Sequence, residues 1–256
     1  MRPIITLTSD FGLADHYVAA MKAVLITQSP EARLVDITHN VPRHDILCGS
    51  ITLERAVDGF PPGTVHLAVV DPGVGTDRRL IVVKVREQLV VCPDNGLITW
   101  AWRIHEAGRP RAYEITWRSA RSSSTFHGRD ILAPVAARLA GGEPLDRTAK
   151  PINDPILLSE LIPASADVTH GRIIHIDHFG NATTNIRHEA LRERGSTVSV
   201  KLNRRLIGKL RRTYWDVAPG KPLALIGSSG LLEIAVRDGS ARDALNIAVG
   251  DRVVLR

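Results

Sequence analysis

Residues 64–79 read Thr-Val-His-Leu-Ala-Val-Val-Asp-Pro-Gly-Val-Gly-Thr-Asp-Arg-Arg, an apolar run that stops at the carboxylate of Asp71. The run predicts a buried strand. Pro72, Gly73 and Gly75 predict a tight turn after it, because proline fixes φ and glycine tolerates positive φ. In an open α/β sheet, ligands bind beyond the carboxyl ends of the strands. The loop is therefore a candidate site, and an ordinary type I turn is the alternative interpretation.

Apolar runs and helical spacing around this strand predict alternating strands and helices. We expect strands over 4–9 and 34–38, a helix that begins near Asp15 and a second helix that begins near Asp45. This order favours βαβ units with a mostly parallel central sheet covered on both faces. Further along, the pattern predicts strands at 80–85, 89–91 and 112–116 and helices at 97–104 and 131–139.

The pattern changes after Gly142, where four prolines punctuate a stretch without helical period, and we expect a linker from about residue 143. From Gly171 onward, short apolar or alternating runs separated by turn residues predict strands, with one helical segment at 187–194. The predicted fold class is therefore α/β. An N-terminal α/β domain over 1–165 precedes a smaller all-β domain, a barrel or a sandwich, over 166–256.

Composition narrows the class of protein. The chain has 256 residues, of which 44% are hydrophobic and 23% charged, as in a globular protein. It has no apolar run of about 18 residues, so no membrane span is expected. The N-terminal residues lack the regions of a signal peptide, and Cys48 and Cys92 form no Cys-x-x-Cys motif, so we expect reduced thiols and a cytoplasmic location.

The net charge of +6 permits an anionic partner without requiring one. The densest basic cluster alternates with apolar residues in a strand-like segment and comprises Lys201, Arg204, Arg205, Lys209, Arg211 and Arg212. We interpret it as the solvated face of a hairpin. Nucleic-acid binding is the less favoured alternative, because no recognised binding motif accompanies the cluster.

Three loops of the N-terminal half contain side chains suited to catalysis or binding. Because they follow parallel strands or precede helices, they could lie together at one edge of the sheet. They contain Asp10, the segment from Asp71 to Arg79, and the segment 126–130 with His127, Arg129 and Asp130. Each residue also has a structural interpretation, such as a turn, a surface charge or an Arg129–Asp130 ion pair with Asp130 capping the next helix. No Gly-x-Ser-x-Gly elbow, phosphate-binding glycine loop or zinc spacing occurs.

In the C-terminal half, two polar loops follow predicted strands, at 177–185 and 227–233. The side chain of Asn181 can both accept and donate, which suits the edge of adenine, and a carboxylate such as Asp10 suits a ribose diol. The alternative is that these loops are ordinary β-turns.

Together these segments resemble the S-adenosyl-L-methionine hydrolase (adenosine-forming) family, which is related to the fluorinases and chlorinases. The matching motifs occur in order across nearly the whole chain, at residues 8–12, 35–39, 70–76, 93–96, 125–130, 179–181 and 227–230. The resemblance implies a homotrimer whose sites lie between the N-terminal domain of one subunit and the C-terminal domain of its neighbour. It implies no metal and no cofactor, with S-adenosyl-L-methionine as the substrate.

The resemblance places the hydrolases' Asp-Arg-His set on Asp71, Arg78 and His127, with Arg79 as the alternative arginine. It implies that water, rather than halide, attacks ribose C5′. It further implies substrate contacts by residues of both domains: Asp10 at the ribose hydroxyls, Asn181 at adenine, Asp177 at the methionine ammonium, and Ser228, Ser229 and Glu233 at the adenine or methionine end. The remaining alternatives are a 5′-halo-5′-deoxyadenosine synthase and a non-catalytic adenosine-binding module.

Overall fold

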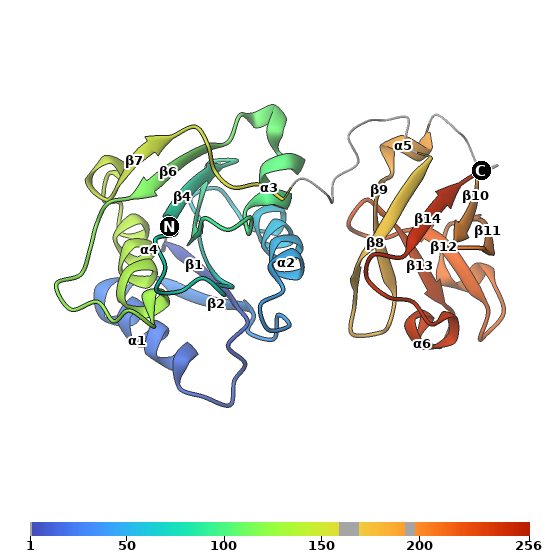
Figure 1. Cartoon of the computed structure of the whole chain (residues 1–256), viewed down its shortest axis with the longest axis horizontal. Coiled ribbons are helices and arrows are strands. Elements are labelled where there is room, and N and C mark those ends of the chain that lie inside the picture. The colour runs from blue at the N-terminus through green and yellow to red at the C-terminus, as the bar shows by residue number, and fades with distance from the viewer. Residues whose placement is uncertain (1, 159–168, 193–197) are drawn as a thin grey trace. The chain divides into compact units, whose positions relative to one another are not determined.

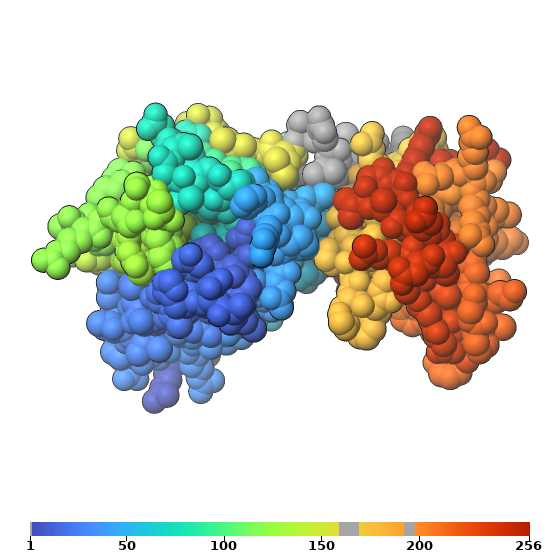
Figure 2. Space-filling model, turned by 60° about the horizontal axis from the view of Figure 1, so that its bottom comes forward, coloured from blue at the N-terminus to red at the C-terminus, as the bar shows by residue number. Residues whose placement is uncertain are grey.

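The computed structural model describes residues 2–158, 169–192 and 198–256. The chain divides into two compact units, Met1–Leu158 and Ser159–Arg256. Each unit is built from one continuous part of the chain, blue to yellow-green in the first and yellow-orange to red in the second (Figure 1 and Figure 2). The expected domain boundary at residue 165 lies outside the described residues.

A seven-stranded sheet with the order β2-β1-β3-β5-β4-β6-β7 forms the centre of the first unit. Its strands are β1 (Ile4–Ser9), β2 (Arg33–Thr38), β3 (Val65–Val69), β4 (Leu80–Val85), β5 (Gln88–Pro93), β6 (Arg111–Ile115) and β7 (Ala149–Ile152). The helices of the unit are α1 (Tyr17–Gln28), α2 (Ile46–Gly59), α3 (Thr99–Ile104) and α4 (Ala133–Ala140), and a π-helical turn, Gly128–Leu132, leads into α4.

The α/β class is confirmed, but parallel pairing covers only half of the sheet. β2, β1, β3 and β5 are parallel neighbours, whereas β4 pairs antiparallel with both β5 and β6, and β7 pairs antiparallel with β6. The reason is local: β4 and β5 are joined by a turn at Arg86 and Glu87, both with positive φ, and so short a connection forces antiparallel strands. The carboxyl ends of β1 and β3 thus lie side by side.

Successive residues of β3, together with Val70 directly after it, pack into two different cores, as expected for a strand covered on both faces. Leu67 and Val69 pack into one buried cluster with Met21 and Leu25 of α1 and with residues of α4. Ala68 and Val70 pack into the other, which includes Leu53 of α2. The helices therefore cover both faces of the sheet (Figure 1).

The two aspartates expected at helix starts differ in the structure. Asp45 caps α2, because its side chain accepts from the backbone N–H of Cys48 at 2.9 Å. Asp15 does not cap α1, which begins at Tyr17 after His16. The linker expected from about residue 143 contains a strand. β7 adds Ala149–Ile152 to the edge of the sheet by pairing with β6, a non-local pairing that four isolated residues do not reveal.

The second unit is a closed barrel with the strand order β10-β11-β12-β13-β9-β8-β14, which selects the barrel from the two predicted all-β architectures. The elements are β8 (His170–Ile176), β9 (Ala182–Arg187), α5 (Glu189–Arg192), β10 (Ser199–Leu202), β11 (Arg205–Arg211), β12 (Pro222–Ile226), β13 (Leu231–Val236), α6 (Ala241–Leu245) and β14 (Arg252–Leu255). The predicted loop at 177–185 is shorter than expected, since β9 begins at Ala182 and pairs with β8 and β13.

The basic cluster lies largely on β11, where Arg205, Lys209 and Arg211 are exposed. This is the solvated face that the alternation predicts. Among the described residues, no helix has the length and apolar character that a membrane span needs.

Candidate active site

The loop after β3 holds Asp71 and Arg78 together. Nε of Arg78 donates to Oδ1 of Asp71 at 2.6 Å, and Nη2 forms an ion pair with Oδ2. The side chains are only 9% and 5% exposed, which shields this bidentate pair from solvent. The turn predicted from Pro72, Gly73 and Gly75 folds the chain back over seven residues, so that the arginine meets the carboxylate at the end of the strand.

His127 joins this pair from a distant loop. Both Nη1 and Nη2 of Arg78 lie 3.2 Å from Nδ1 of His127. Because a guanidinium can only donate, Nδ1 is the acceptor, and the neutral ring carries its proton on Nε2. Burial lowers the pKa of His127, the charge of Arg78 lowers it further, and Asp71 opposes the shift. The predicted Asp71, Arg78 and His127 therefore form one cluster with a neutral histidine.

Arg79 has a different place. It ion-pairs with buried Asp94 at 2.8 Å and with exposed Asp154 at 2.8 Å. Asp94 also accepts from the backbone N–H of Ile156 at 2.8 Å, so Arg79 ties the end of β5 to a later segment. Geometry thus separates the two neighbouring arginines, and Arg78 is the one beside His127.

Gly75 explains how the two loops come so close. Its φ of +85° lies in the left-handed region, and a Cβ at this position would stand 2.7 Å from the carbonyl oxygen of Ser124. Any other residue would therefore be both strained and in collision with the loop that carries His127. Gly75 is therefore required both by the left-handed backbone of the turn and by its close packing against Ser124.

Aromatic side chains beside the cluster line a cavity of about 200 Å³, which Asp71 and His127 also line. Phe11 and Phe126 pack edge to face with ring centroids 5.8 Å apart, and Tyr17 packs against Phe126 at 5.3 Å. Sequence patterns did not single out these aromatic residues as part of a site. Phe11 directly follows the predicted residue Asp10, and Phe126 directly precedes His127, which was the available signal for these two rings.

Asp10 lies at the end of β1, next to Phe11. Its Oδ2 accepts from the backbone N–H of His44 at 2.9 Å. The predicted Arg129–Asp130 ion pair is confirmed at 2.6 Å. Asp130 is no helix cap, however, because it lies inside the π-helical turn and accepts from the backbone N–H of Ser123 at 2.8 Å.

The barrel brings together four further predicted residues. Asp177, Asn181, Ser228 and Glu233 line one groove of about 1070 Å³, and Ser229 is the neighbour of Ser228 in the same turn. Oδ1 of Asp177 accepts from the backbone N–H of Asn181 at 2.8 Å, and Nδ2 of Asn181 lies 3.2 Å from Oδ2 of Asp177. The carboxylate therefore fixes both the backbone and the amide of Asn181.

Aromatic residues of the same groove were missed as site candidates. The hydroxyl of Tyr214 donates to Oε1 of Glu233 at 2.6 Å. Burial raises the pKa of Glu233, and Tyr214 opposes that shift. Trp215 is 76% exposed, and the guanidinium of Arg237 stacks on its ring at 3.8 Å. The groove combines aromatic faces with polar groups, a lining that suits a nucleoside.

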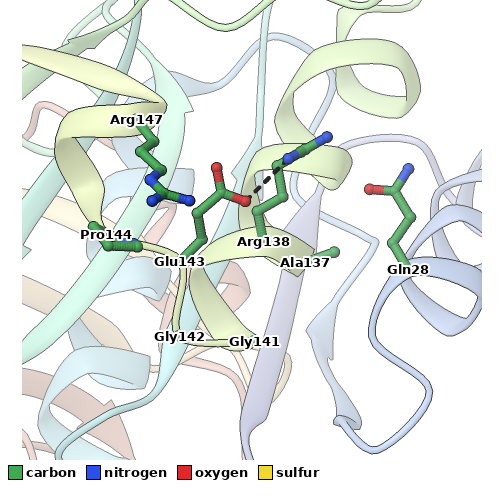
Figure 3. A pocket seen from close by; sticks show the side chains of 8 residues that line it. All are labelled: Gln28, Ala137, Arg138, Gly141, Gly142, Glu143, Pro144 and Arg147. Carbon is green, nitrogen blue, oxygen red and sulfur yellow. Dashed lines mark hydrogen bonds and ion pairs between the residues drawn. The ribbon is translucent and has the colours of Figure 1, made fainter.

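A third hollow, of about 590 Å³, is lined by residues at the C-terminal ends of α1 and α4 and by the segment that follows α4. Glu143 lies between Arg138 and Arg147 there, and its Oε2 is 3.0 Å from Nη1 of Arg138 (Figure 3). Its charge offsets those arginines, and none of the predicted site residues lines this hollow. Within the described part of the chain, no group of three or more His, Cys, Asp or Glu side chains is placed to hold a metal ion.

Comparison with known proteins identifies the family and several relatives of the chain. The model of the SAM hydroxide adenosyltransferase N-terminal domain matches residues 5–149, and that of the C-terminal domain matches residues 171–254. An (R)-S-adenosyl-L-methionine hydrolase of Salinispora tropica is 42% identical, covering 98% of this chain and 97% of that protein. A fluorinase of Actinoplanes sp. is more distant, at 28% identity over 91% of this chain and 90% of that protein.

Among solved structures, an uncharacterized conserved protein from Thermotoga maritima matches with a TM-score of 0.90 and 38% sequence identity, covering 99% of this chain and 100% of that one. The resemblance inferred from the motifs is thereby confirmed. The chain belongs to the SAM hydroxide adenosyltransferase family.

Proposed function

We propose that this protein is an enzyme that hydrolyses S-adenosyl-L-methionine to adenosine and L-methionine. The observation that carries the proposal is the Asp71–Arg78–His127 cluster beside a cavity, in a chain about 40% identical to proteins named for this hydrolysis. Arg78 rather than Arg79 is the proposed catalytic arginine.

The main chemical requirement of this reaction is an activated water, because the sulfonium is already a good leaving group. Water attacks ribose C5′ in line with the sulfonium. The C5′–S bond breaks with its electron pair going to sulfur, so methionine leaves as a neutral thioether. The attacking water must lose one proton to become the 5′-hydroxyl of adenosine. We therefore assign no general acid, metal or cofactor to this reaction and expect a chelator to leave its rate unchanged.

The geometry suggests how three residues divide the work. The charge of Arg78 favours hydroxide character on the water. Asp71 accepts on both oxygens from Arg78 and so orients the guanidinium. In the resting state Nδ1 of His127 accepts from Arg78, and Nε2 carries the ring proton. His127 acts as the general base once Nδ1 has left Arg78 and faces the water, and it takes the water's proton on Nδ1 to become an imidazolium. General-base assistance of this kind contributes about 10²–10⁴-fold.

Substrate contacts follow the two groups of residues. Asp10 binds the ribose hydroxyls, Asn181 the adenine edge, and Asp177 the methionine ammonium. Ser228, Ser229 and Glu233 line the adenine or methionine end. We propose that the α/β unit of one subunit and the barrel of a neighbour form each site in a homotrimer. We place the enzyme in the cytoplasm, where its two cysteines, neither in a disulfide, would stay reduced.

The first test is chromatography of products from purified protein and S-adenosyl-L-methionine, with chloride present and absent and with the (R) and (S) sulfonium epimers separately. Adenosine and methionine in both salts, lost in Asp71→Ala, support the hydrolase. A chlorinated nucleoside that forms only with chloride would favour the halide-using alternative. Adenosine binding without turnover would favour the non-catalytic module.

Co-expression of Arg78→Ala with Asn181→Ala tests the shared site. If each site combines two subunits, random mixing restores about a quarter of the sites, although each variant alone is inactive. If one subunit supplies both groups, mixing restores nothing. Light scattering of the wild-type protein measures the trimer independently.

A further inference from the structure

A chain of side-chain hydrogen bonds runs from the surface of the α/β unit to the end of β1. Nζ of Lys22 is 2.6 Å from Oδ2 of Asp36, and Oδ1 of Asp36 is 3.1 Å from Nε2 of His39. Nδ1 of His39 is in turn 2.7 Å from Oγ of Ser9. The chain ends at the residue that directly precedes Asp10.

The order Ser9–His39–Asp36 is that of a hydrolase triad, but burial excludes a nucleophilic serine. Ser9 is 0% exposed and His39 is 3% exposed, so no substrate can reach the hydroxyl. Oγ of Ser9 also accepts from the backbone N–H of Phe11 at 3.4 Å. Because the carboxylate of Asp36 only accepts, Nε2 of His39 carries a proton toward it, and in the neutral ring Nδ1 accepts the hydroxyl hydrogen of Ser9. Ser9, His39 and Asp36 therefore stabilise the local structure, and Ser9 is not a catalytic nucleophile.

This series of hydrogen bonds lies next to the loop that carries Asp10, and backbone hydrogen bonds fix the same loop. The backbone N–H of Gly12 donates to the carbonyl of His39 at 2.7 Å, and that of Val41 donates to the carbonyl of Ser9 at 3.3 Å. Asp10 itself accepts from the backbone N–H of His44. The loops after β1 and β2 are thus joined on both sides of Asp10, and His39 contributes a side-chain and a backbone bond to this junction.

We propose that His39 is a positioning residue that, through Ser9, fixes the backbone on which Asp10 meets the ribose. This inference rests on the proposed function, in which Asp10 binds the ribose hydroxyls. It assigns His39, Ser9 and Asp36 to substrate placement rather than to bond breaking. Since a misplaced ribose also misaligns C5′ with the water, the loss extends to the turnover step.

The sheet contains a matched control. Nδ1 of His66 is 2.8 Å from Oγ1 of Thr6, and its Nε2 is 2.5 Å from Oε1 of Gln88. This is the same kind of buried histidine bridge from β1, three residues before Ser9. Gln88 continues it to the carbonyls of Val57 and Phe60, however, and not to the loop that carries Asp10.

A double-mutant cycle on the full-length protein tests the proposal. We expect His39→Gln to lower kcat/KM for S-adenosyl-L-methionine about tenfold, and less than about twofold when Asp10 is already alanine, because coupled residues are non-additive. His66→Gln should leave kcat/KM within about twofold in both backgrounds while lowering the melting temperature. Equal losses from His39→Gln with and without Asp10 would overturn the proposal.

Asp36→Asn supplies a second variant if His39→Gln does not fold, since the side chain of Asp36 is 40% exposed. It should show the same dependence on Asp10. Amide hydrogen exchange separates this inference from the proposed function, because it needs no turnover. Faster exchange at residues 10–12 and 44 in the His39 or Asp36 variant, but not in His66→Gln, supports the positioning role even if the wild-type protein does not hydrolyse the substrate. Unchanged exchange there would contradict it.

Discussion

Arg78 and His127 lie 49 residues apart in the chain, yet both Nη atoms of the arginine are 3.2 Å from Nδ1 of the histidine. The contact is possible because Asp71 holds the other edge of the guanidinium. The arginine thus connects the end of β3 to the loop before α4 and fixes which ring nitrogen of His127 carries the proton.

Alanine substitutions of the two neighbouring arginines should affect different properties, catalysis at Arg78 and stability at Arg79. Arg78→Ala should lower kcat about 10²-fold or more, because it removes the charge beside the water. Arg79→Ala should keep kcat but lose roughly 3 kcal/mol of unfolding free energy, because it leaves the carboxylate of Asp94 buried and unpaired. Steady-state kinetics and urea titrations of both variants measure this contrast. An active Arg78→Ala enzyme would remove this arginine from the proposed mechanism.

The pH profile should report a neutral His127. Because burial and Arg78 lower the pKa of this imidazole from 6.5, the ring stays neutral to a more acidic pH than an ordinary histidine. The activity that depends on the neutral ring is fully present above pH 6.5 and is lost as the pH falls through the lowered pKa. We expect the acid limb of kcat/KM below pH 6.5 and its disappearance in His127→Asn. A limb above that pH would contradict the neutral assignment.

Gly75→Ala should disturb the site more than an equally strained glycine elsewhere. Gly63 has φ +82°, close to the +85° of Gly75, but no atom lies within 4 Å of the position that a Cβ would take there. Gly63→Ala therefore reports backbone strain alone, about 1–2 kcal/mol. Gly75→Ala adds the collision with Ser124, and we expect about a tenfold further loss of kcat. Equal activity in both variants would show that the loop yields without displacing Arg78.

The position of the Tyr214 ring should depend on a hydrogen-bond acceptor at position 233 and not on the negative charge of Glu233. Glu233→Gln retains Oε1 as an acceptor, whereas Glu233→Ala removes it and frees the ring that walls the groove. We expect KM for S-adenosyl-L-methionine to rise roughly three- to tenfold in Glu233→Ala and less than about twofold in Glu233→Gln. A similar rise in both variants would instead mean that the carboxylate charge contacts the substrate.

His66 should make the α/β unit sensitive to acid. Burial lowers its pKa to about 4, while hydrogen bonding to Gln88 opposes the shift. Between about pH 6.5 and 4, the unfolded chain therefore binds a proton that the folded protein excludes, and stability falls on acidification. The contribution across this window is roughly 3 kcal/mol. Denaturant titrations at several pH values should show a smaller acid-dependent loss in His66→Gln than in the wild type.

Much of the fold follows from local sequence. Apolar runs predicted β1, β2 and β3, and helical spacing predicted the helices between them. Burial on both faces explains the continuous apolar runs of β1 and β3. Local signals missed the five-residue helix α6 and the strands β7 and β9. Each of these two strands is short and defined by its non-local partners, which are β6 for β7 and both β8 and β13 for β9.

For the site, the sequence by itself determined the residue types, their order and the family resemblance that joins them. The sequence alone does not show which of the neighbouring residues Arg78 and Arg79 contacts Asp71 and His127. It depends on which side of the loop each side chain leaves, and only the folded turn decides that. The same holds for Ser9 and His39, separated by 30 residues. Parallel pairing of β1 with β2 brings their following loops together, and a hydrogen bond between distant residues exists only once those strands are in register.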